Sequence, residues 1–556
     1  MENTTLRDRP AALALLIVLV IAVLYLPWLS HTDLVHEETR RAVIARNMVE
    51  SGDYLVPELA ERIYLAKPPV FNWMIVATSA PTGEITEFSA RLPSVLALGA
   101  LALFMAFVVG RRLDAPGRWL LGLSVLFTGE LMHKAVLAEI DVFFTLLVTT
   151  SLWGWFELDQ RGYRGLALWL PPALLVAAAF LTKREPGLVF YYLAIGGYLV
   201  HQRRFVELFR PAHLFAGTVT LVVIGSWIGL MIARVGGIGP LLADLDKEVL
   251  DRGISSNAGD YIAHFASYPL EVLGAALPFS VLLLPFAWRG VRRAVGEHHG
   301  RLVAFATIAV LINLPIYWLR ADSAVRYFLP MLPTLLVLCA AVFDVFVTRL
   351  DELPAGARRT LHGVGLVLLL LAWVFAAAGL ALSVPGAFPD VAGPLLPAPL
   401  MSVLCAALLA GGAWLGWRHR GDAMVLVLAG TLGFGVLFRL LTLGYVLPHQ
   451  ARELAREENV PRILTTIREQ LPDDVDAVQA LGSMPHAVWF YDRQDLVVPE
   501  ARMERLGSAA SAYVLVHIPN RERLDALDGR VERITRIPYA DQDFILARIK
   551  GALLHP

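Results

Sequence analysis

A charged segment between two long apolar segments contains the residue types that could do chemistry. It runs from His36 to Ser94 and holds carboxylates, arginines and a lysine. A carboxylate can deprotonate a hydroxyl group, whereas arginine and lysine stabilise an anion such as phosphate. A short turn would be enough to join two apolar helices. We therefore interpret this segment as a binding or catalytic loop.

The first part of this segment, EETRRAVIARNMVE over residues 37–50, has the spacing of an amphipathic helix lying at a membrane surface. Glu37 lies three and four residues before Arg40 and Arg41, so on a helix its carboxylate can reach both guanidinium groups. A solvated ion pair would have the same spacing. Lys67 follows in Lys-Pro-Pro, where proline fixes the backbone beside the ammonium group.

The composition excludes an ordinary soluble protein. Of the 556 residues, 56% are hydrophobic and 17% are charged, and the mean hydropathy is +0.58. Apolar segments recur that are long enough to cross a bilayer, and we expect about thirteen transmembrane helices. They are predicted near residues 11–30, 88–110, 119–136, 141–157, 166–182, 187–200, 213–233, 269–287, 302–319, 327–347, 361–383, 398–416 and 423–446. The formal net charge of −1 gives no sign of a nucleic-acid partner.

Basic residues give the predicted topology. Alternate loops are rich in arginine, which predicts a cytoplasmic N-terminus and an extracytoplasmic tail. The chain has only five lysines, and four of them fall in loops predicted to lie outside: Lys67, Lys134, Lys183 and Lys247. Because lysine is a compact charge suited to phosphate, these residues suggest a ring of ammonium groups around an anionic lipid head. Chance placement with ordinary headgroup contacts is the alternative.

Further candidate residues lie outside the charged segment. Asp141 is predicted to begin a helix at the outer surface, where a carboxylate can also be a simple helix cap. Arg439 lies inside the last predicted helix and either faces a pocket or extends to the surface. Asp260, Tyr261 and His264 lie in a predicted outer loop and are candidates for an acceptor entrance. A lone histidine there is more often a packed side chain.

The tail differs in composition from the rest of the chain. Hydropathy falls after residue 447 and charged residues return, which predicts a small soluble domain. Its helix is followed by segments typical of strands near residues 475–481, 495–498, 513–517, 531–537 and 544–549, which predict an α/β domain. We therefore divide the chain into a transmembrane domain over 1–447, with a catalytic first loop over 31–87, and an extracytoplasmic domain over 448–556. The tail either shapes the acceptor side or serves as a structural cap.

The motifs of the first loop resemble those of a known family. The runs Glu-Glu-x-Arg, Glu-Ser-Gly-Asp-Tyr-Leu-Val-Pro, Tyr-x-x-Lys-Pro-Pro and Ala-Arg-Leu-Pro-Ser are similar to those of GT-C-type glycosyltransferases that use lipid-phosphate-linked sugars. The most similar branch is that of the bacterial lipid A aminoarabinose transferases and their protein O-mannosyltransferase-like relatives. The resemblance covers most of the chain and implies an all-α polytopic membrane protein of the GT-C type with a small C-terminal α/β domain.

The resemblance also implies which carboxylates act in catalysis. Glu37 and Glu38 match the family's Asp-Glu pair, and Asp141 matches the acid before the fourth helix. Glu37 has one more methylene group than the family's usual aspartate, and a misplacement of that size can cost about 100-fold in rate. Three explanations remain: the pocket is adapted to glutamate, Glu38 or Asp141 is the main acid, or the enzyme is weak.

The residues that bind the donor phosphate follow from the same comparison. Arg40 matches the arginine that follows the family's acidic pair, and Lys67 matches the lysine of its Lys-Pro motif. We expect both to bind the donor phosphate, with Lys183 and Arg326 as further candidates. These cations would stabilise the polyprenyl phosphate as it leaves the anomeric carbon in an inverting transfer. An acceptor hydroxyl needs a carboxylate as base, for which Glu37 comes first and Asp141 second.

The acceptor class stays open between lipid A, another glycan, a lipid and a protein. An acceptor phosphate needs no strong base, and Glu37 and Asp141 would then be free to hold a divalent cation, so the metal requirement also stays open. We expect an undecaprenyl phosphate sugar as donor, membrane lipids as partners, a monomer, and the bacterial cytoplasmic membrane as location. Two other function classes remain, a transporter or flippase of an anionic lipid and a non-catalytic lipid-binding scaffold. The absence of matching interrupted helices in two halves argues against the transporter.

Overall fold

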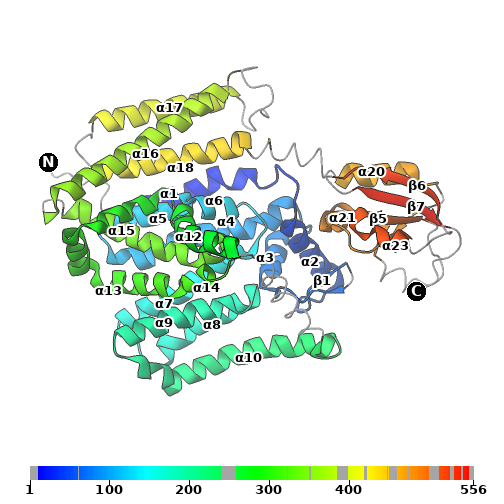
Figure 1. Cartoon of the computed structure of the whole chain (residues 1–556), viewed down its shortest axis with the longest axis horizontal. Coiled ribbons are helices and arrows are strands. Elements are labelled where there is room, and N and C mark those ends of the chain that lie inside the picture. The colour runs from blue at the N-terminus through cyan, green and yellow to red at the C-terminus, as the bar shows by residue number, and fades with distance from the viewer. Residues whose placement is uncertain are drawn as a thin grey trace. The chain divides into compact units, whose positions relative to one another are not determined.

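The structure is a computed structural model in which contacts divide the chain into two compact units (Figure 1). It describes residues 10–60, 62–239, 258–321, 323–349, 352–382, 384, 398–418, 423–446, 449, 460–473, 475–499, 513–525, 531–539 and 543–549. The helical unit comprises Met1–Leu29, Leu65–Phe71 and Arg91–Tyr445. The loop–sheet unit comprises Ser30–Tyr64, Asn72–Ala90 and Val446–Pro556.

The helical unit is an assembly of long apolar helices. Its elements are α1 (Pro10–Leu24), η2 (Leu26–Trp28), α4 (Glu87–Phe104, which begins in the other unit), η3 (Met105–Val109), η4 (Gly110–Arg112), α5 (Ala115–Phe127), α6 (Gly129–Lys134), α7 (Ile140–Gln160), α8 (Leu166–Lys183), α9 (Pro186–His201), η5 (Phe205–Phe209), α10 (Pro211–Arg234), α12 (Ala258–Ala275), η6 (Phe279–Ala287), α13 (Arg289–Asn313), α14 (Pro315–Trp318), η7 (Val325–Met331), α15 (Leu332–Thr348), α16 (Ala355–Leu382), α17 (Ala398–Arg418), α18 (Ala423–Leu441) and η9 (Thr442–Val446).

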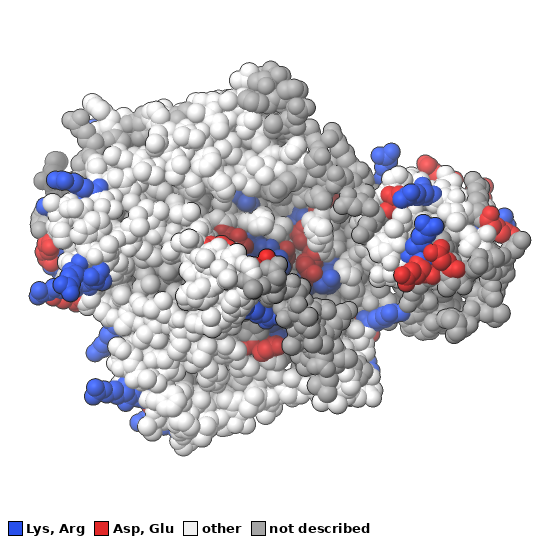
Figure 2. All heavy atoms as spheres, viewed as in Figure 1, with Lys and Arg blue, Asp and Glu red and all other residues white. Residues whose placement is uncertain are grey.

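Within the described residues, seven helices are long and apolar enough to cross a membrane, and a bent pair would make eight. The protein is therefore a multi-span membrane protein, as the composition predicts. The number of about thirteen spans stays a prediction. Figure 2 shows basic side chains gathered at one end of the helical unit and a largely uncharged surface along its length. Such a surface is suited to contact with lipid tails.

Two of the predicted helices are broken in the structure. The segment predicted as one helix over 269–287 contains the end of α12 and all of η6, which meet at an angle of 116°. Pro278 lies at the break and has no N–H to continue the hydrogen-bond ladder. The segment predicted over 119–136 is divided at Thr128, whose backbone is extended between α5 and α6.

Small residues bring helices of this unit close together. A methyl group added at Gly430 of α18 would come within 2.8 Å of Cβ of Leu368 on α16. At Gly365 of α16 it would come within 3.2 Å of Leu426 on α18. Such close approach is typical of helices packed in a membrane, because a small residue lets the backbones meet.

The loop–sheet unit contains the first loop and the C-terminal sheet. The first loop forms α2 (Glu37–Ser51), the hairpin β1 (Glu58–Leu59) and β2 (Arg62–Ile63), and most of α3 (Val70–Ser79). The C-terminal part forms α20 (Val460–Gln470), β3 (Val478–Leu481), α21 (His486–Tyr491), β4 (Val497–Val498), β5 (Tyr513–His517), η10 (Ile518–Asn520), α23 (Arg521–Asp525), β6 (Val531–Ile537) and β7 (Phe544–Ile549). The predicted C-terminal α/β domain is thereby confirmed.

The C-terminal sheet is mixed, with strand order β4-β3-β5-β7-β6. β3 is parallel to β4 and β5, whereas β7 is antiparallel to β5 and β6. β3 and the central part of β5 are buried, as their continuous apolar sequences predict. Figure 1 shows the short helices α20, α21 and α23 around this sheet.

Helix α21 joins the C-terminal sheet to the first loop. Arg46 of α2 donates hydrogen bonds to the carbonyl oxygens of Trp489 and Phe490, at 2.6 and 3.2 Å. The hydroxyl of Tyr491 accepts from the backbone N–H of Leu34 at 2.7 Å and bonds to Glu87 at 3.2 Å. These contacts explain why both segments belong to one compact unit. The division of the chain into domains at residue 447 stays a prediction.

Candidate active site

Glu37 lies in the first turn of α2 and bridges two arginines. Its carboxylate oxygens lie 2.7 Å from Nη1 of Arg40 and 3.3 Å from Nη2 of Arg41. The predicted helix is confirmed, and it ends at Gly52, whose left-handed conformation suits glycine. The expected i,i+3 and i,i+4 pairs are therefore both formed. Glu37 is 42% exposed at its side chain, whereas Arg41 is only 4% exposed, so the pair is asymmetric in its access to solvent.

Glu38, the second member of the acidic pair, is buried beside the start of the same helix. Its carboxylate accepts a hydrogen bond from the backbone N–H of Val35 at 3.3 Å. Thr39 donates to the carbonyl oxygen of His36 at 2.7 Å. A carboxylate here satisfies backbone donors that a helix start leaves without partners. Glu38 therefore holds the turn that presents Glu37.

Two residues, Asn72 and Tyr64, contact the arginines of α2. Asn72 of α3 donates to the backbone carbonyl of Arg41 at 2.8 Å. Tyr64, directly after β2, is held by a bond from its N–H to the carbonyl of Pro57 at 2.8 Å. The ring centroid of Tyr64 lies 5.8 Å from the guanidinium carbon of Arg40 and 5.6 Å from that of Arg41. Both guanidinium groups therefore lie within cation–π distance of the same ring. The hairpin that provides this ring was not predicted.

Lys67 lies in the bend that precedes α3 and is half-buried. By contacts it belongs to the helical unit, together with Pro68 and Pro69. The neighbouring Phe71 packs against Phe143 of α7 with ring centroids 6.1 Å apart. This contact packs the start of α3 against α7, and Lys67 lies only a few residues before it in the sequence.

A second charged cluster lies within the helical unit, where α7 begins and α8 ends. Lys183, the last residue of α8, pairs with Asp141 in the first turn of α7. Lys134 of α6 pairs with Glu139 at 2.7 Å. The two carboxylates interact with each other, and burial raises the pKa of Glu139 while the bond from Lys134 opposes this shift. Asp141 is therefore part of an ion-pair network and not a simple helix cap.

Aromatic rings surround the Lys183 ammonium group. Its nitrogen lies 5.5 Å from the ring centroid of Phe144 and 5.6 Å from that of Tyr327. Arg326 is exposed and its guanidinium carbon lies 5.5 Å from the Tyr327 centroid. The structure thus brings together Asp141, Lys183 and Arg326, which the sequence places far apart. Lys134 also joins this cluster, whereas Lys247 lies outside the described residues.

The acceptor candidates on α12 hold that helix against its neighbour α14. The Tyr261 hydroxyl donates to the carbonyl of Leu319 at 3.0 Å, and Nε2 of His264 lies 3.1 Å from the carbonyl oxygen of Tyr317. His264 also packs on Tyr268, with ring centroids 4.8 Å apart. Asp260 is exposed in the first turn of α12. The packed-histidine alternative for His264 therefore matches its observed contacts.

Arg439 is enclosed by helices and does not extend to a surface. Only 1% of the residue is exposed. Its Nε donates to the carbonyl oxygen of Leu24 at 3.2 Å, and its guanidinium carbon lies 4.6 Å from the ring centroid of Tyr25. The alternative in which Arg439 extends to the outer surface is wrong, because α1 offers both an acceptor and an aromatic face at depth.

The carboxylates of both clusters are paired with cations. Among the described residues, no group of three or more His, Cys, Asp or Glu side chains is placed to hold a metal ion. Glu37 is bridged to two guanidinium groups and Asp141 is paired with an ammonium group. The metal requirement stays open.

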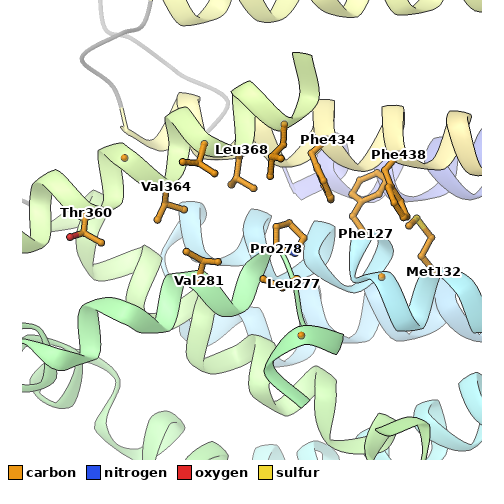
Figure 3. A pocket seen from close by; sticks show the side chains of 15 residues that line it. Phe127, Met132, Leu277, Pro278, Val281, Thr360, Val364, Leu368, Phe434 and Phe438 are labelled. Carbon is orange, nitrogen blue, oxygen red and sulfur yellow. The ribbon is translucent and has the colours of Figure 1, made fainter. Parts of the chain in front are cut away.

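An apolar cavity of about 500 Å³ lies in the helical unit (Figure 3). It lies between α16, α18, the break between α12 and η6, and the segment from α5 to α6. The labelled side chains in Figure 3 point into it from several helices, with Thr360 toward one end and Phe127 and Met132 toward the other. The broken helix at Pro278 forms one wall. Such a lining is suited to a hydrocarbon chain.

Some residues of the site could not be predicted from the sequence. His486 begins α21 and interacts electrostatically with Arg40, Glu37 and Arg41. Burial and the two arginines lower the pKa of His486 to about 4. His486 is far from the first loop in sequence, so no local pattern could predict that it lies near Glu37 and the two arginines. For Arg41 the four-residue spacing from Glu37 was the available signal.

Comparisons with known proteins agree with this architecture. A family model described as "Dolichyl-phosphate-mannose-protein mannosyltransferase" matches residues 66–228. An undecaprenyl phosphate-alpha-4-amino-4-deoxy-L-arabinose arabinosyl transferase of Pseudomonas paraeruginosa is 28% identical over 557 residues, covering 96% of this chain and 95% of the relative. One of two such transferases of Pseudomonas fluorescens is 30% identical over 377 residues, covering 65% of this chain and 64% of the relative.

Solved structures confirm the fold class. The crystal structure of ArnT from Cupriavidus metallidurans bound to undecaprenyl phosphate superposes with a TM-score of 0.67 at 20% sequence identity, and the match covers 98% of this chain and 100% of that one. The apo structure of the same protein gives a TM-score of 0.66. In sequence this chain is similar to undecaprenyl phosphate aminoarabinose transferases, and its fold matches that of a solved ArnT, as the motifs of its first loop predict.

Proposed function

We propose that this protein is an inverting glycosyltransferase that transfers a sugar from a polyprenyl phosphate to an acceptor at the outer face of the bacterial cytoplasmic membrane. The observation that carries the proposal is the ion-pair bridge that Glu37 forms to both Arg40 and Arg41. It combines a carboxylate with two guanidinium groups, and Glu37 and Arg40 occupy the positions that resemble the family's first-loop motif. The named relatives use undecaprenyl phosphate as carrier, which supports the same donor class here.

The chemistry is a single displacement at the anomeric carbon. An acceptor oxygen forms the new bond while the bond to the phosphate oxygen breaks, and the phosphate leaves with the electron pair. Arg40 and Lys67 stabilise the leaving phosphate, because cations lower the energy of charge that develops in the transition state. When the acceptor is a hydroxyl, Glu37 or Asp141 takes its proton.

The second cluster, within the helical unit, holds the other candidate base, Asp141. Asp141 is oriented by Lys183, and Lys183 is in turn flanked by the rings of Phe144 and Tyr327. A carboxylate held in this way cannot rotate freely, which favours a fixed role in proton transfer or in binding a sugar hydroxyl. Arg326 lies beside the same ring and is the further candidate for the phosphate.

The apolar cavity supports a lipid-linked donor. Its lining residues are nearly all apolar, and Thr360 is the polar exception. We assign it to several isoprene units of the donor chain. The arginine-rich loops support a cytoplasmic N-terminus, and the odd number of predicted spans then leaves the C-terminal domain extracytoplasmic.

The test is sugar transfer by the full-length protein in lipid nanodiscs, with a radiolabelled pool of polyprenyl phosphate sugars and bacterial envelope lipids as acceptors. Glu37→Gln and Lys67→Ala are compared with Glu297→Gln, a control on the exposed part of α13. We expect transfer by wild type and the control and a loss of about 100-fold or more in the two site variants. Full activity of both variants would overturn the assignment of the first loop. Lipid binding without transfer by wild type would favour the scaffold or the transporter.

A further inference from the structure

Four buried polar atoms gather where α2, the segment after β2, and α21 meet. They are Nε of Arg40, Nη1 of Arg41, Oη of Tyr64 and Nδ1 of His486, and none has a hydrogen-bond partner among the described residues. Buried polar groups are nearly always paired, because an unpaired one costs free energy. Arg41 is the strongest case, since its side chain is only 4% exposed. A cluster of unpaired donors points to a missing ligand.

The geometry keeps these donors available. Glu37 engages Nη1 of Arg40 and Nη2 of Arg41, whereas Nε of Arg40 and Nη1 of Arg41 have no hydrogen-bond partner among the described residues. The ring centroid of Tyr64 lies within 6 Å of both guanidinium carbons. His486 is held in place because the other end of α21 is bonded to Arg46.

The charge of the cluster favours an anion. Two guanidinium groups and one carboxylate leave a net charge of about +1 when His486 is neutral. Burial and the arginines lower the pKa of His486 to about 4, so the imidazole is neutral near pH 7. The charged groups that influence the pKa of His486 are Arg40, Glu37 and Arg41.

We propose that Arg40, Arg41, Tyr64 and His486 form a pocket for a phosphate group, in which the C-terminal domain supplies a specificity-determining residue. This inference rests on the proposed function, which places a phosphate at the first loop, and it adds Arg41, Tyr64 and His486 to its recognition. Donors from three elements suit a tetrahedral phosphate group, and guanidinium groups match phosphate with two parallel hydrogen bonds. The phosphate comes from a lipid head or from a free phosphate.

The sharpest variant is Tyr64→Phe, which removes one hydroxyl and keeps the ring under both arginines. His486→Ala tests the contribution of the C-terminal domain, and Tyr54→Phe is a matched control on an exposed tyrosine of the same loop. Full-length proteins in phosphatidylcholine nanodiscs are titrated with inorganic phosphate and, separately, with undecaprenyl phosphate. Melting temperatures show whether each variant is folded.

We expect both site variants to bind about tenfold more weakly than wild type and the control, because each loses a hydrogen bond to an anion. Weaker binding of undecaprenyl phosphate alone assigns the pocket to the lipid head, and weaker binding of inorganic phosphate alone assigns it to a free phosphate. Unchanged binding of both ligands in two folded variants overturns the pocket.

Sugar transfer by the same samples separates this result from the proposed function. If wild type transfers sugar but phosphate binding does not depend on Tyr64 or His486, the pocket is rejected and the proposed enzyme activity is supported. If phosphate binding depends on Tyr64 and His486 but wild type transfers no sugar, the pocket is supported and the proposed enzyme activity is rejected.

Discussion

Lys183 at the end of α8 pairs with Asp141 at the start of α7, across 42 residues of sequence. The pair joins two helix ends and places a carboxylate and an ammonium group side by side in a largely buried setting. Neither residue can be replaced without leaving the other charge without its partner.

Asp141→Asn keeps the shape of the side chain and removes its charge. We expect kcat for sugar transfer to fall by about 100-fold or more, because an amide cannot accept a proton or balance Lys183. The measurement is steady-state transfer in nanodiscs, with Glu297→Gln as the control. An unchanged kcat would show that Asp141 serves the fold alone.

Glu37→Asp shortens the bridge between Arg40 and Arg41. A carboxylate one methylene shorter cannot keep both contacts without movement of the helix, so we expect the rate to fall by about tenfold to 100-fold. This result would show that the pocket is adapted to glutamate, although the resemblance implies aspartate at this position. Equal activity would show that the length of this side chain does not matter, and higher activity of Glu37→Asp would identify glutamate as a cause of weak activity.

The low pKa of His486 predicts how stability changes with pH. Between pH 6.5 and about 4 the unfolded chain binds a proton at this histidine that the folded chain does not. The histidine therefore makes stability fall as pH is lowered through this window. Melting temperatures of wild type and His486→Asn, measured from pH 7 to pH 4, should diverge with wild type losing more. If the two melting temperatures changed with pH in parallel, His486 would not be buried beside the arginines.

Arg46→Ala should loosen the C-terminal sheet from the first loop. The variant loses two bonds to the backbone of α21, at Trp489 and Phe490. We expect faster limited proteolysis of the C-terminal region and a melting temperature lower by several degrees. The control is Arg293→Ala, because that arginine is 82% exposed on α13. Proteolysis at the rate of the control would show that Arg46 is not needed for docking.

Val364→Phe reduces the apolar cavity, whereas Val374→Phe adds the same ring on an exposed position of the same helix. If the cavity holds isoprene units, KM should rise for a long-chain polyprenyl donor and stay unchanged for a donor with two isoprene units. Transfer assays with both donors measure this difference. An equal effect on both donors would mean that the ring disturbs packing and not chain binding.

Several elements could be predicted from the sequence because their signals are local. The helix over α2 follows from its periodicity and from Gly52, and the C-terminal strands follow from short apolar runs between polar turns. The break at Pro278 was missed, because proline is also tolerated inside membrane helices and hydropathy alone continues across it. The hairpin β1–β2 is too short to give a pattern.

Hydropathy and short-range spacing are enough to predict a multi-span membrane protein with a charged first loop and a C-terminal α/β domain. The same local spacing places Glu37 within reach of Arg40 and Arg41, since one helical turn determines that contact. The contact of Lys183 with Asp141 and the approach of His486 to the arginines of α2 come from the folded chain alone. Those contacts depend on how distant segments pack, and no local pattern records the packing of segments far apart in the chain.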